Sequence, residues 1–222
     1  MCKYEREYYD YEEKEIILFR CGEEAVKDGF CVFHHPTYWK EKPEDVAKKF
    51  YEKVEKAIKN NEKLLCIGYN LPKIDLSGKK FPKPTYFSWA TFNETAYFRW
   101  ATFKTAYFSW ATFKTAYFRW ATFKTAYFSG ATFNETADFR LATFKTAYFS
   151  GATFKTAYFS GATFKTAYFS WATFKTAYFS WATFKTAYFS GATFNETADF
   201  RLATFKTAYF SGATFKTAYF SG

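Results

Sequence analysis

Residues 142–151 read Ala-Thr-Phe-Lys-Thr-Ala-Tyr-Phe-Ser-Gly, and close copies of this stretch fill the chain from Thr85 to Gly222. Each copy consists of two five-residue units with phenylalanine at the centre, and the whole stretch contains 27 such units. A repeat of this kind decides the architecture, because each unit can bury its apolar side only against its neighbours.

A five-residue period suits neither a plain helix nor a plain strand. In an α-helix the phenylalanines would be spread around the cylinder, and in one long strand they would alternate between the two faces. A chain that bends sharply once per unit can point every phenylalanine inward, and its successive turns then pair like strands. The period therefore predicts a β-solenoid.

Two units, Ala137-Asp138-Phe139-Arg140-Leu141 and Ala198-Asp199-Phe200-Arg201-Leu202, carry a specific resemblance. The stretch resembles the pentapeptide-repeat family, whose pattern is Ala-(Asp or Asn)-Leu-x-x with Phe often replacing Leu. The resemblance implies an all-β, right-handed quadrilateral β-helix with four units per coil and with alanine and phenylalanine pointing inward. On that basis we expect residues 74–222 to form about seven coils. The near-identity of the copies indicates recent gene expansion or a designed sequence.

Three units, which begin at Ala90, Ala131 and Ala192, have a sixth residue. Counted from Thr85 they are the second, tenth and twenty-second units, so a coil of four units places all three on one side. Each contains an Asn-Glu-Thr sequon, which we interpret as the chemistry of a bulge, because asparagine suits irregular backbone.

Residues 1–73 differ from the repeats, because they have a mixed composition and contain all four cysteines and both histidines. Short strands are expected at residues 16–19, 31–33 and 64–67. Pro43 should open a helix whose apolar stripe is Val46, Phe50, Val54 and Ile58. A solenoid exposes unpaired backbone at its end, so we expect residues 1–73 to form a small α+β cap.

One constellation in this region could have metal chemistry. Three thiolates and an imidazole, from Cys2, Cys21, Cys31 and His34, would complete a tetrahedral structural zinc site. The spacing includes no Cys-x-x-Cys pair, and His35 or Cys66 could replace one of the four ligands. Plain buried thiols are the competing interpretation.

The charge of the chain is concentrated in the repeats, which contain ten lysines and four arginines but only five acidic residues. Some members of the family that the repeats resemble mimic DNA and bind gyrase. Mimicry of DNA needs an acidic surface, whereas the surface of these repeats is basic. The candidate binding residues are Trp89, Trp100, Trp110 and Trp120, with a column of lysines at Lys104, Lys124, Lys145, Lys165, Lys185 and Lys206. Nucleic acid is one candidate partner through these residues, but a solvated lysine face and packed tryptophans are favoured.

No combination of nucleophile, base and orienting group is apparent, so we expect no enzyme. We expect a non-catalytic scaffold or protein-interaction module, with a nucleic-acid-associated protein as the alternative. Residues 1–15 show no secretory signal and no stretch is apolar enough for a membrane span, so a cytoplasmic protein is expected. The last coil lacks a capping helix, and the family resemblance makes a homodimer through that coil the expected assembly.

Overall fold

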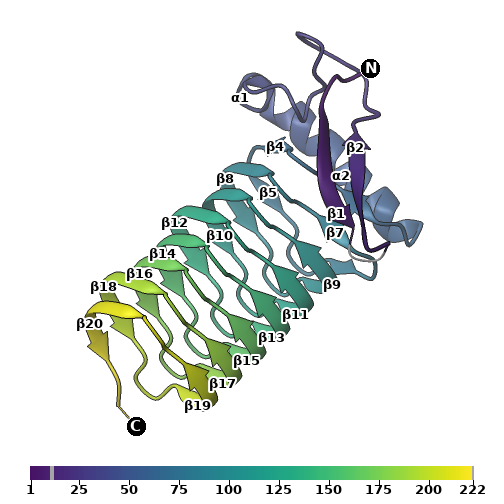
Figure 1. Cartoon of the computed structure of the whole chain (residues 1–222). Coiled ribbons are helices and arrows are strands. Elements are labelled where there is room, and N and C mark those ends of the chain that lie inside the picture. Colours follow the sequence, from purple (N-terminus) through teal and green to yellow (C-terminus); the bar gives the residue numbers. More distant parts are fainter. Residues whose placement is uncertain (11–12, 222) are drawn as a thin grey trace.

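The computed structural model describes residues 1–10 and 13–221, and it shows a long rod with a smaller N-terminal region at one end (Figure 1). The N-terminal region contains β1 (Glu5–Asp10), β2 (Glu15–Arg20), α1 (Tyr38–Glu41) and α2 (Pro43–Lys59). The rod contains the short strands β3 (Leu64–Leu65), β4 (Asn70–Leu71), β5 (Ile74–Asp75), β6 (Lys80–Phe81) and β7 (Thr85–Tyr86). Its regular strands are β8 (Thr91–Tyr97), β9 (Thr102–Tyr107), β10 (Thr112–Tyr117), β11 (Thr122–Tyr127), β12 (Thr132–Asp138), β13 (Thr143–Tyr148), β14 (Thr153–Tyr158), β15 (Thr163–Tyr168), β16 (Thr173–Tyr178), β17 (Thr183–Tyr188), β18 (Thr193–Asp199), β19 (Thr204–Tyr209) and β20 (Thr214–Tyr219).

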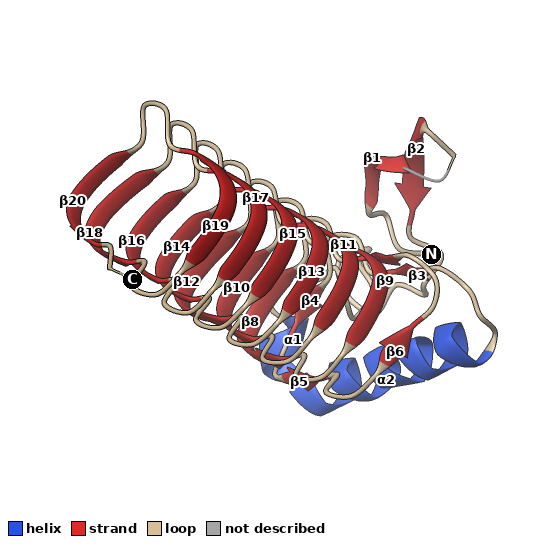
Figure 2. Cartoon of the chain, turned by 90° about the horizontal axis from the view of Figure 1, so that it is seen from below, coloured by secondary structure: helices blue, strands red, loops and turns tan. Residues whose placement is uncertain are grey.

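The rod is a parallel β-solenoid of about eight turns. From β8 onward, even-numbered strands form one sheet and odd-numbered strands form the other, so each strand pairs with the strand one coil away (Figure 2). The register joins equivalent residues, as where Phe123 pairs with Phe144 and Ala126 with Ala147. The predicted β-solenoid is therefore confirmed.

Phenylalanine fills the interior of the rod in four columns. Phe128 and Phe149, one coil apart, stack with ring centroids 4.9 Å apart, and Phe128 meets Phe139 of the opposite column edge to face at 5.5 Å. The alanines between them are buried as well, with 0% of Ala126 and Ala147 exposed. Full burial of one phenylalanine is worth roughly 1.5–3 kcal/mol relative to its exposed state. Repetition of this contact along the rod supplies the core.

The three six-residue units all lie in the same sheet, as predicted. They form β8, β12 and β18, and the register shifts where these strands pair with their five-residue neighbours. The extra residue leaves the inward phenylalanine and alanine of each unit in register, because Phe133 still pairs with Phe154 and Ala137 with Ala157.

Parallel pairing begins earlier in the chain than we expected. Strand β3 pairs with β7 and β4 pairs with β8, so residues 64–71 already lie in the two sheets. The physical reason is a degenerate five-residue period, because Cys66, Leu71 and Leu76 are fully buried at the central positions that phenylalanine occupies later. This additional coil accounts for about eight turns instead of seven.

From Trp89 to Gly212, the last residue of every unit with tyrosine or aspartate at its second position has left-handed backbone. Glycine occupies this corner in several coils, as at Gly151 with φ 66°, but Trp110 adopts φ 60° and Leu141 adopts φ 59° at equivalent corners. A residue with a side chain is strained there by about 1–2 kcal/mol. The packing of each side chain on the next coil must offset this strain.

Helix α2 lies against the first coil. Its residues Val46, Phe50 and Val54 are fully buried, as the apolar stripe predicts, and Phe50 contacts Phe87 with ring centroids 6.3 Å apart. The backbone N–H of Asp75 also donates to the hydroxyl of Tyr51 over 2.7 Å. None of the helices in the described residues is long and apolar enough to cross a membrane.

The expected strand at residues 31–33 is wrong. The carbonyl oxygen of Cys31 accepts hydrogen bonds from the N–H groups of His34 and His35, at 3.1 and 3.0 Å, so the chain turns here. An extended chain would separate residues 31 and 34 by roughly 10 Å, whereas the turn brings their side chains together. The strand expected at residues 16–19 is confirmed as β2.

Candidate metal centre and surface columns

The four predicted ligands lie together in the N-terminal region. The sulfur atoms of Cys2, Cys21 and Cys31 and a ring nitrogen of His34 all lie within 4.8 Å of one another, and all four residues are buried. Cys2 precedes β1, Cys21 follows β2, and the turn after them supplies Cys31 and His34. The structure therefore brings together a set of residues that could hold a metal ion.

The spacing of these atoms suits a tetrahedral ion. Cys21 Sγ lies 3.7 Å from Cys31 Sγ, and His34 Nδ1 lies 3.6 Å from Cys2 Sγ and 3.3 Å from Cys31 Sγ. Bonds of about 2.3 Å to sulfur and 2.0 Å to nitrogen in tetrahedral zinc correspond to ligand separations of about 3.5–3.8 Å. The cluster needs little rearrangement to enclose such an ion.

Neighbouring groups orient the imidazole of His34. Its Nε2 donates to the carbonyl oxygen of Ile67 over 2.9 Å, because a carbonyl can only accept, and this leaves Nδ1 facing the sulfurs. The ring of Tyr4 stacks on the imidazole at 3.8 Å. The N–H of Cys31 donates to the sulfur of Cys2 over 3.3 Å. Such outer contacts fix the tautomer of a histidine ligand and stabilise charge on a thiolate.

The thiols of Cys21 and Cys31 are joined by a hydrogen bond through one shared proton position. Their hydrogen bond raises the pKa of Cys31 to about 12, and burial adds to this shift, whereas the same bond lowers the pKa of Cys21. Of the two thiols, Cys21 therefore loses its proton more readily, and its sulfur then accepts from the Cys31 thiol. A metal cation would take the place of the shared proton, because thiols bind metals in the deprotonated form.

The two alternative ligands lie elsewhere. His35 Nε2 faces the carboxylate of Asp28 at 3.2 Å, and its Nδ1 accepts from the N–H of Thr37 at 3.3 Å. Cys66 occupies a core position of the first coil, where burial raises the pKa of its thiol. Neither residue belongs to the cluster.

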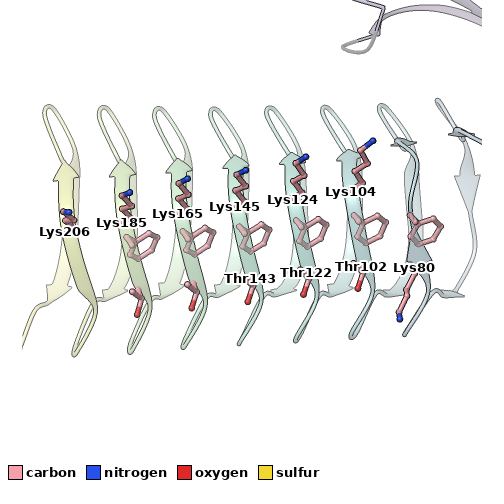
Figure 3. A pocket seen from close by; sticks show the side chains of 18 of the residues that line it. Lys80, Thr102, Lys104, Thr122, Lys124, Thr143, Lys145, Lys165, Lys185 and Lys206 are labelled. Atoms are coloured by element: carbon pink, nitrogen blue, oxygen red, sulfur yellow. The ribbon is translucent and has the colours of Figure 1, made fainter.

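The predicted lysine column borders a groove on the sheet of odd-numbered strands (Figure 3). The groove has a volume of about 1020 Å³ and runs along seven strands, from β6 to β19. One wall is the lysine row, Lys104, Lys124, Lys145, Lys165, Lys185 and Lys206. The other wall is the threonine row, Thr102, Thr122, Thr143, Thr163, Thr183 and Thr204, and the phenylalanine column that begins at Phe103 lies between them.

The lysines of the opposite sheet have acids nearby, because the three bulges introduce the glutamates of the repeat. Lys175 Nζ lies 3.5 Å from a carboxylate oxygen of Glu196, and Glu135 accepts from the hydroxyl of Thr115 over 2.8 Å. The lysine row makes no ion pair within residues 1–10 and 13–221. The two faces of the rod therefore differ in charge although they repeat the same motif.

The predicted tryptophans lie in two corner columns, where they stack along the rod but stay exposed at the surface, with Trp100 57% and Trp110 62% exposed. Trp100 and Trp120 stack on each other with centroids 4.8 Å apart, and the guanidinium of Arg119 lies 4.3 Å from the Trp120 ring. The ring of Trp110 lies over Gly130, where it would clash with an added Cβ atom. These tryptophans pack along their own columns.

Trp89 differs, because it lies beneath the N-terminal hairpin. The guanidinium of Arg6, on β1, lies 4.9 Å from the Trp89 ring. Tyr8 of the same strand packs edge to face on Tyr86 with centroids 5.3 Å apart. No spacing in the sequence could reveal these contacts, because they join segments about 80 residues apart.

Comparison with protein families supports this description of the rod. Residues 118–163, 149–190 and 182–222 each match a family model described as pentapeptide repeats in nine copies. No curated protein matches the chain.

Proposed function

Because the chain belongs to the pentapeptide-repeat family, we propose that it is a non-catalytic scaffold or protein-interaction module. The observation that carries the proposal is the packing of the rod: its interior is filled by phenylalanine and alanine, while its outside repeats the same side chains at coil spacing. Such a rod offers a long, regular surface, and the buried side chains described along it fill its interior with phenylalanine and alanine. We infer that it is not an enzyme.

We further propose that Cys2, Cys21, Cys31 and His34 bind a structural zinc ion. The support is the donor set, its burial and its near-tetrahedral spacing. When bound, zinc would stabilise the fold of the N-terminal region, because four protein ligands leave no open position for catalysis. We place the module in the cytoplasm, where thiols remain reduced and available to a metal.

Elemental analysis of the purified protein, without added zinc, tests the metal proposal. We expect about one zinc per chain, in line with a closed four-ligand site. A protein that is folded and free of metal after purification under reducing conditions would refute the proposal.

Site-directed photo-crosslinking tests the scaffold proposal. A photoreactive amino acid would replace Lys155 or Lys165, which lie on opposite sheets, and adducts formed in cells would be identified. We expect defined protein adducts that survive nuclease treatment. The absence of protein adducts from both positions would count against a protein-interaction module.

The second candidate function is association with nucleic acid through the basic surface. It is favoured by one observation, the unpaired lysine row, which could contact phosphates. A salt titration of oligonucleotide binding distinguishes it, because phosphate contacts weaken steeply as salt rises. Binding that is weak at low salt and insensitive to salt would exclude this function.

We also propose a homodimer through the last coil. The two sheets end at β19 and β20, and Phe220 is 58% exposed next to them. Pairing of these edges in a second copy would cover both the backbone groups and the phenylalanine. Light scattering that gives the monomer mass at high protein concentration would refute the dimer.

A further inference from the structure

We propose that the groove between the lysine row and the threonine row binds an extended acidic segment of a partner protein. This inference rests on the proposed scaffold function and deepens it, because it names the surface and the chemistry of the partner. The charge, the width and the lining of the groove all fit such a segment.

The charge of the groove requires an acidic partner. The six lysines of the row make no ion pair within the described residues, and their ammonium groups repeat once per coil along one wall. At a strand spacing of about 4.8 Å, five steps carry this charge over about 24 Å. A ligand with carboxylates along its length would replace repulsion between neighbouring lysines by attraction.

The dimensions of the groove favour an extended chain. A volume of about 1020 Å³ is spread over seven strands. Six steps of about 4.8 Å span about 29 Å, which leaves a cross-section of about 35 Å². The two walls stand two residues apart on each strand, about 6.6 Å, whereas an α-helix is about 10–12 Å across and could not settle to the floor. An extended segment of about nine residues has the matching length at about 3.3 Å per residue.

The lining can recognise such a segment. The hydroxyls of the threonine row make no hydrogen bond within the part of the chain described, so they are free to bond the backbone of a bound peptide. Alternate side chains of an extended peptide point to opposite sides. A segment that alternates acidic and apolar residues would therefore direct carboxylates to the lysines and apolar groups away from them.

The aromatic side chains near the groove argue for a peptide over a single-stranded nucleic acid. Base stacking needs open ring faces. Trp100 and Trp120, at the corner beside the threonine row, stack on each other, and Arg119 lies on the Trp120 ring. Trp181 at the same corner is 66% exposed, but the neighbouring coils carry Gly161 and Leu202 at the equivalent position. The tyrosines beyond the lysine row also stack on one another, as Tyr148 and Tyr168 do at 4.8 Å. The groove therefore offers nucleic acid a row of charges, without a ring at each coil on which successive bases could stack.

Fluorescence anisotropy with the full chain tests the inference. The probe is a labelled nine-residue peptide that alternates glutamate and valine, and its glutamine counterpart is the uncharged reference. The variant is Lys165→Glu, in the groove, and the matched control is Lys155→Glu, on the opposite sheet. Both lysines lie in identical Ala-Thr-Phe-Lys-Thr units, so the two variants carry the same charge in the same local sequence.

We expect the glutamate peptide to bind more tightly than the glutamine peptide. Lys165→Glu should weaken it at least tenfold, and Lys155→Glu less than twofold. Equal weakening by both variants would reveal general charge attraction and overturn the proposal. So would tighter binding of a thymidine oligonucleotide in competition, or displacement of the peptide by self-association of the chain. If Lys165→Glu does not weaken peptide binding more than Lys155→Glu does, but protein crosslinks form at position 155, the groove assignment is wrong and the scaffold function is still supported.

Discussion

His34 donates a hydrogen bond from Nε2 to the carbonyl oxygen of Ile67, across 2.9 Å, and so connects the cysteine–histidine cluster to the first coil. A second bond acts beside it, because the N–H of Asn70 donates to the carbonyl of Phe33 over 2.7 Å. The ring of Phe33 stacks on Tyr69, with centroids 4.3 Å apart. The residues around the cluster are thus part of the packing that covers the end of the solenoid.

The first prediction concerns this connection. His34→Ala should remove the ligand and the bond to Ile67, so we expect loss of bound metal and faster hydrogen exchange in residues 1–34. Exchange in the rod beyond residue 85 should be unchanged, because repeats are stabilised by their nearest neighbours. Hydrogen exchange measured by mass spectrometry checks both regions.

The matched control for this prediction is His35→Ala. His35 is also buried, but its ring faces Asp28 and the N–H of Thr37 instead of the sulfurs. The His35→Ala variant should retain the metal. Equal metal loss in both variants would show that the cluster does not depend on the imidazole of His34.

A second prediction uses two phenylalanines of one column. Phe159 stacks between Phe139 and Phe179, whereas Phe220 stacks only on Phe200 and is 58% exposed. Phe159→Ala should reduce the free energy of unfolding by about 3–5 kcal/mol, because it leaves a cavity. Phe220→Ala should cost much less, and denaturant unfolding compares the two. Similar losses would mean that the last coil is covered in solution.

Much of this fold could be predicted from the repeat, because the spacing of its phenylalanines is nearly constant. Every phenylalanine from Phe87 onward falls at the centre of a unit, and the three longer units fall on one side of four-unit coils. The first coil was less apparent, because Cys66, Leu71 and Leu76 take the central positions there without the surrounding motif. A five-residue period is hard to recognise in a single sequence when its central positions carry different residue types.

The candidate cluster was predictable in composition but not in its setting. Cysteine and histidine are recognisable ligands at any spacing, so the four residues could be named. The carbonyl of Ile67 and the ring of Tyr4 could not, since a backbone carbonyl has no sequence signature and tyrosine has many other uses. The left-handed corners were hidden for a similar reason, because tryptophan is not a residue that normally marks positive φ.

A third prediction follows from those corners. Gly130 and Gly151 both adopt left-handed backbone, with φ 67° and 66°. An added Cβ atom at Gly151 meets nothing within 4 Å, whereas at Gly130 it would lie 2.6 Å from the ring of Trp110. Gly151→Ala should therefore cost only the backbone strain, about 1–2 kcal/mol.

Gly130→Ala should cost more than Gly151→Ala and should shift the tryptophan emission, because the ring of Trp110 must move. Thermal unfolding and fluorescence spectra measure the two effects. If both variants have the same stability and the same spectrum, the ring does not lie on Gly130 in solution.

The last prediction concerns pH. Asp199 is 3% exposed and accepts bonds from the Nε and Nη2 atoms of Arg201 at 2.9 and 2.7 Å. These bonds lower the pKa of Asp199 below its ordinary value, and they outweigh the burial that would raise it. A lowered pKa in the folded state means that the ionised carboxylate stabilises the fold. This contribution is complete above the unfolded pKa, near 4, and is lost as pH falls through the lower folded value.

Asp199→Asn should therefore destabilise the rod at pH 7, and its effect on the unfolding midpoint should shrink as the pH falls below about 4, because the carboxyl of the parent chain takes up a proton as the pH passes through its lowered pKa. Guanidinium chloride unfolding of both proteins across this range measures the difference. Glu94→Gln is the control, because Glu94 is exposed and makes no ion pair within residues 1–10 and 13–221. Glu94→Gln shows what the same change from a carboxyl to an amide costs at a surface position of the rod. A constant difference for Asp199→Asn would show that the pair with Arg201 contributes nothing to the pH dependence.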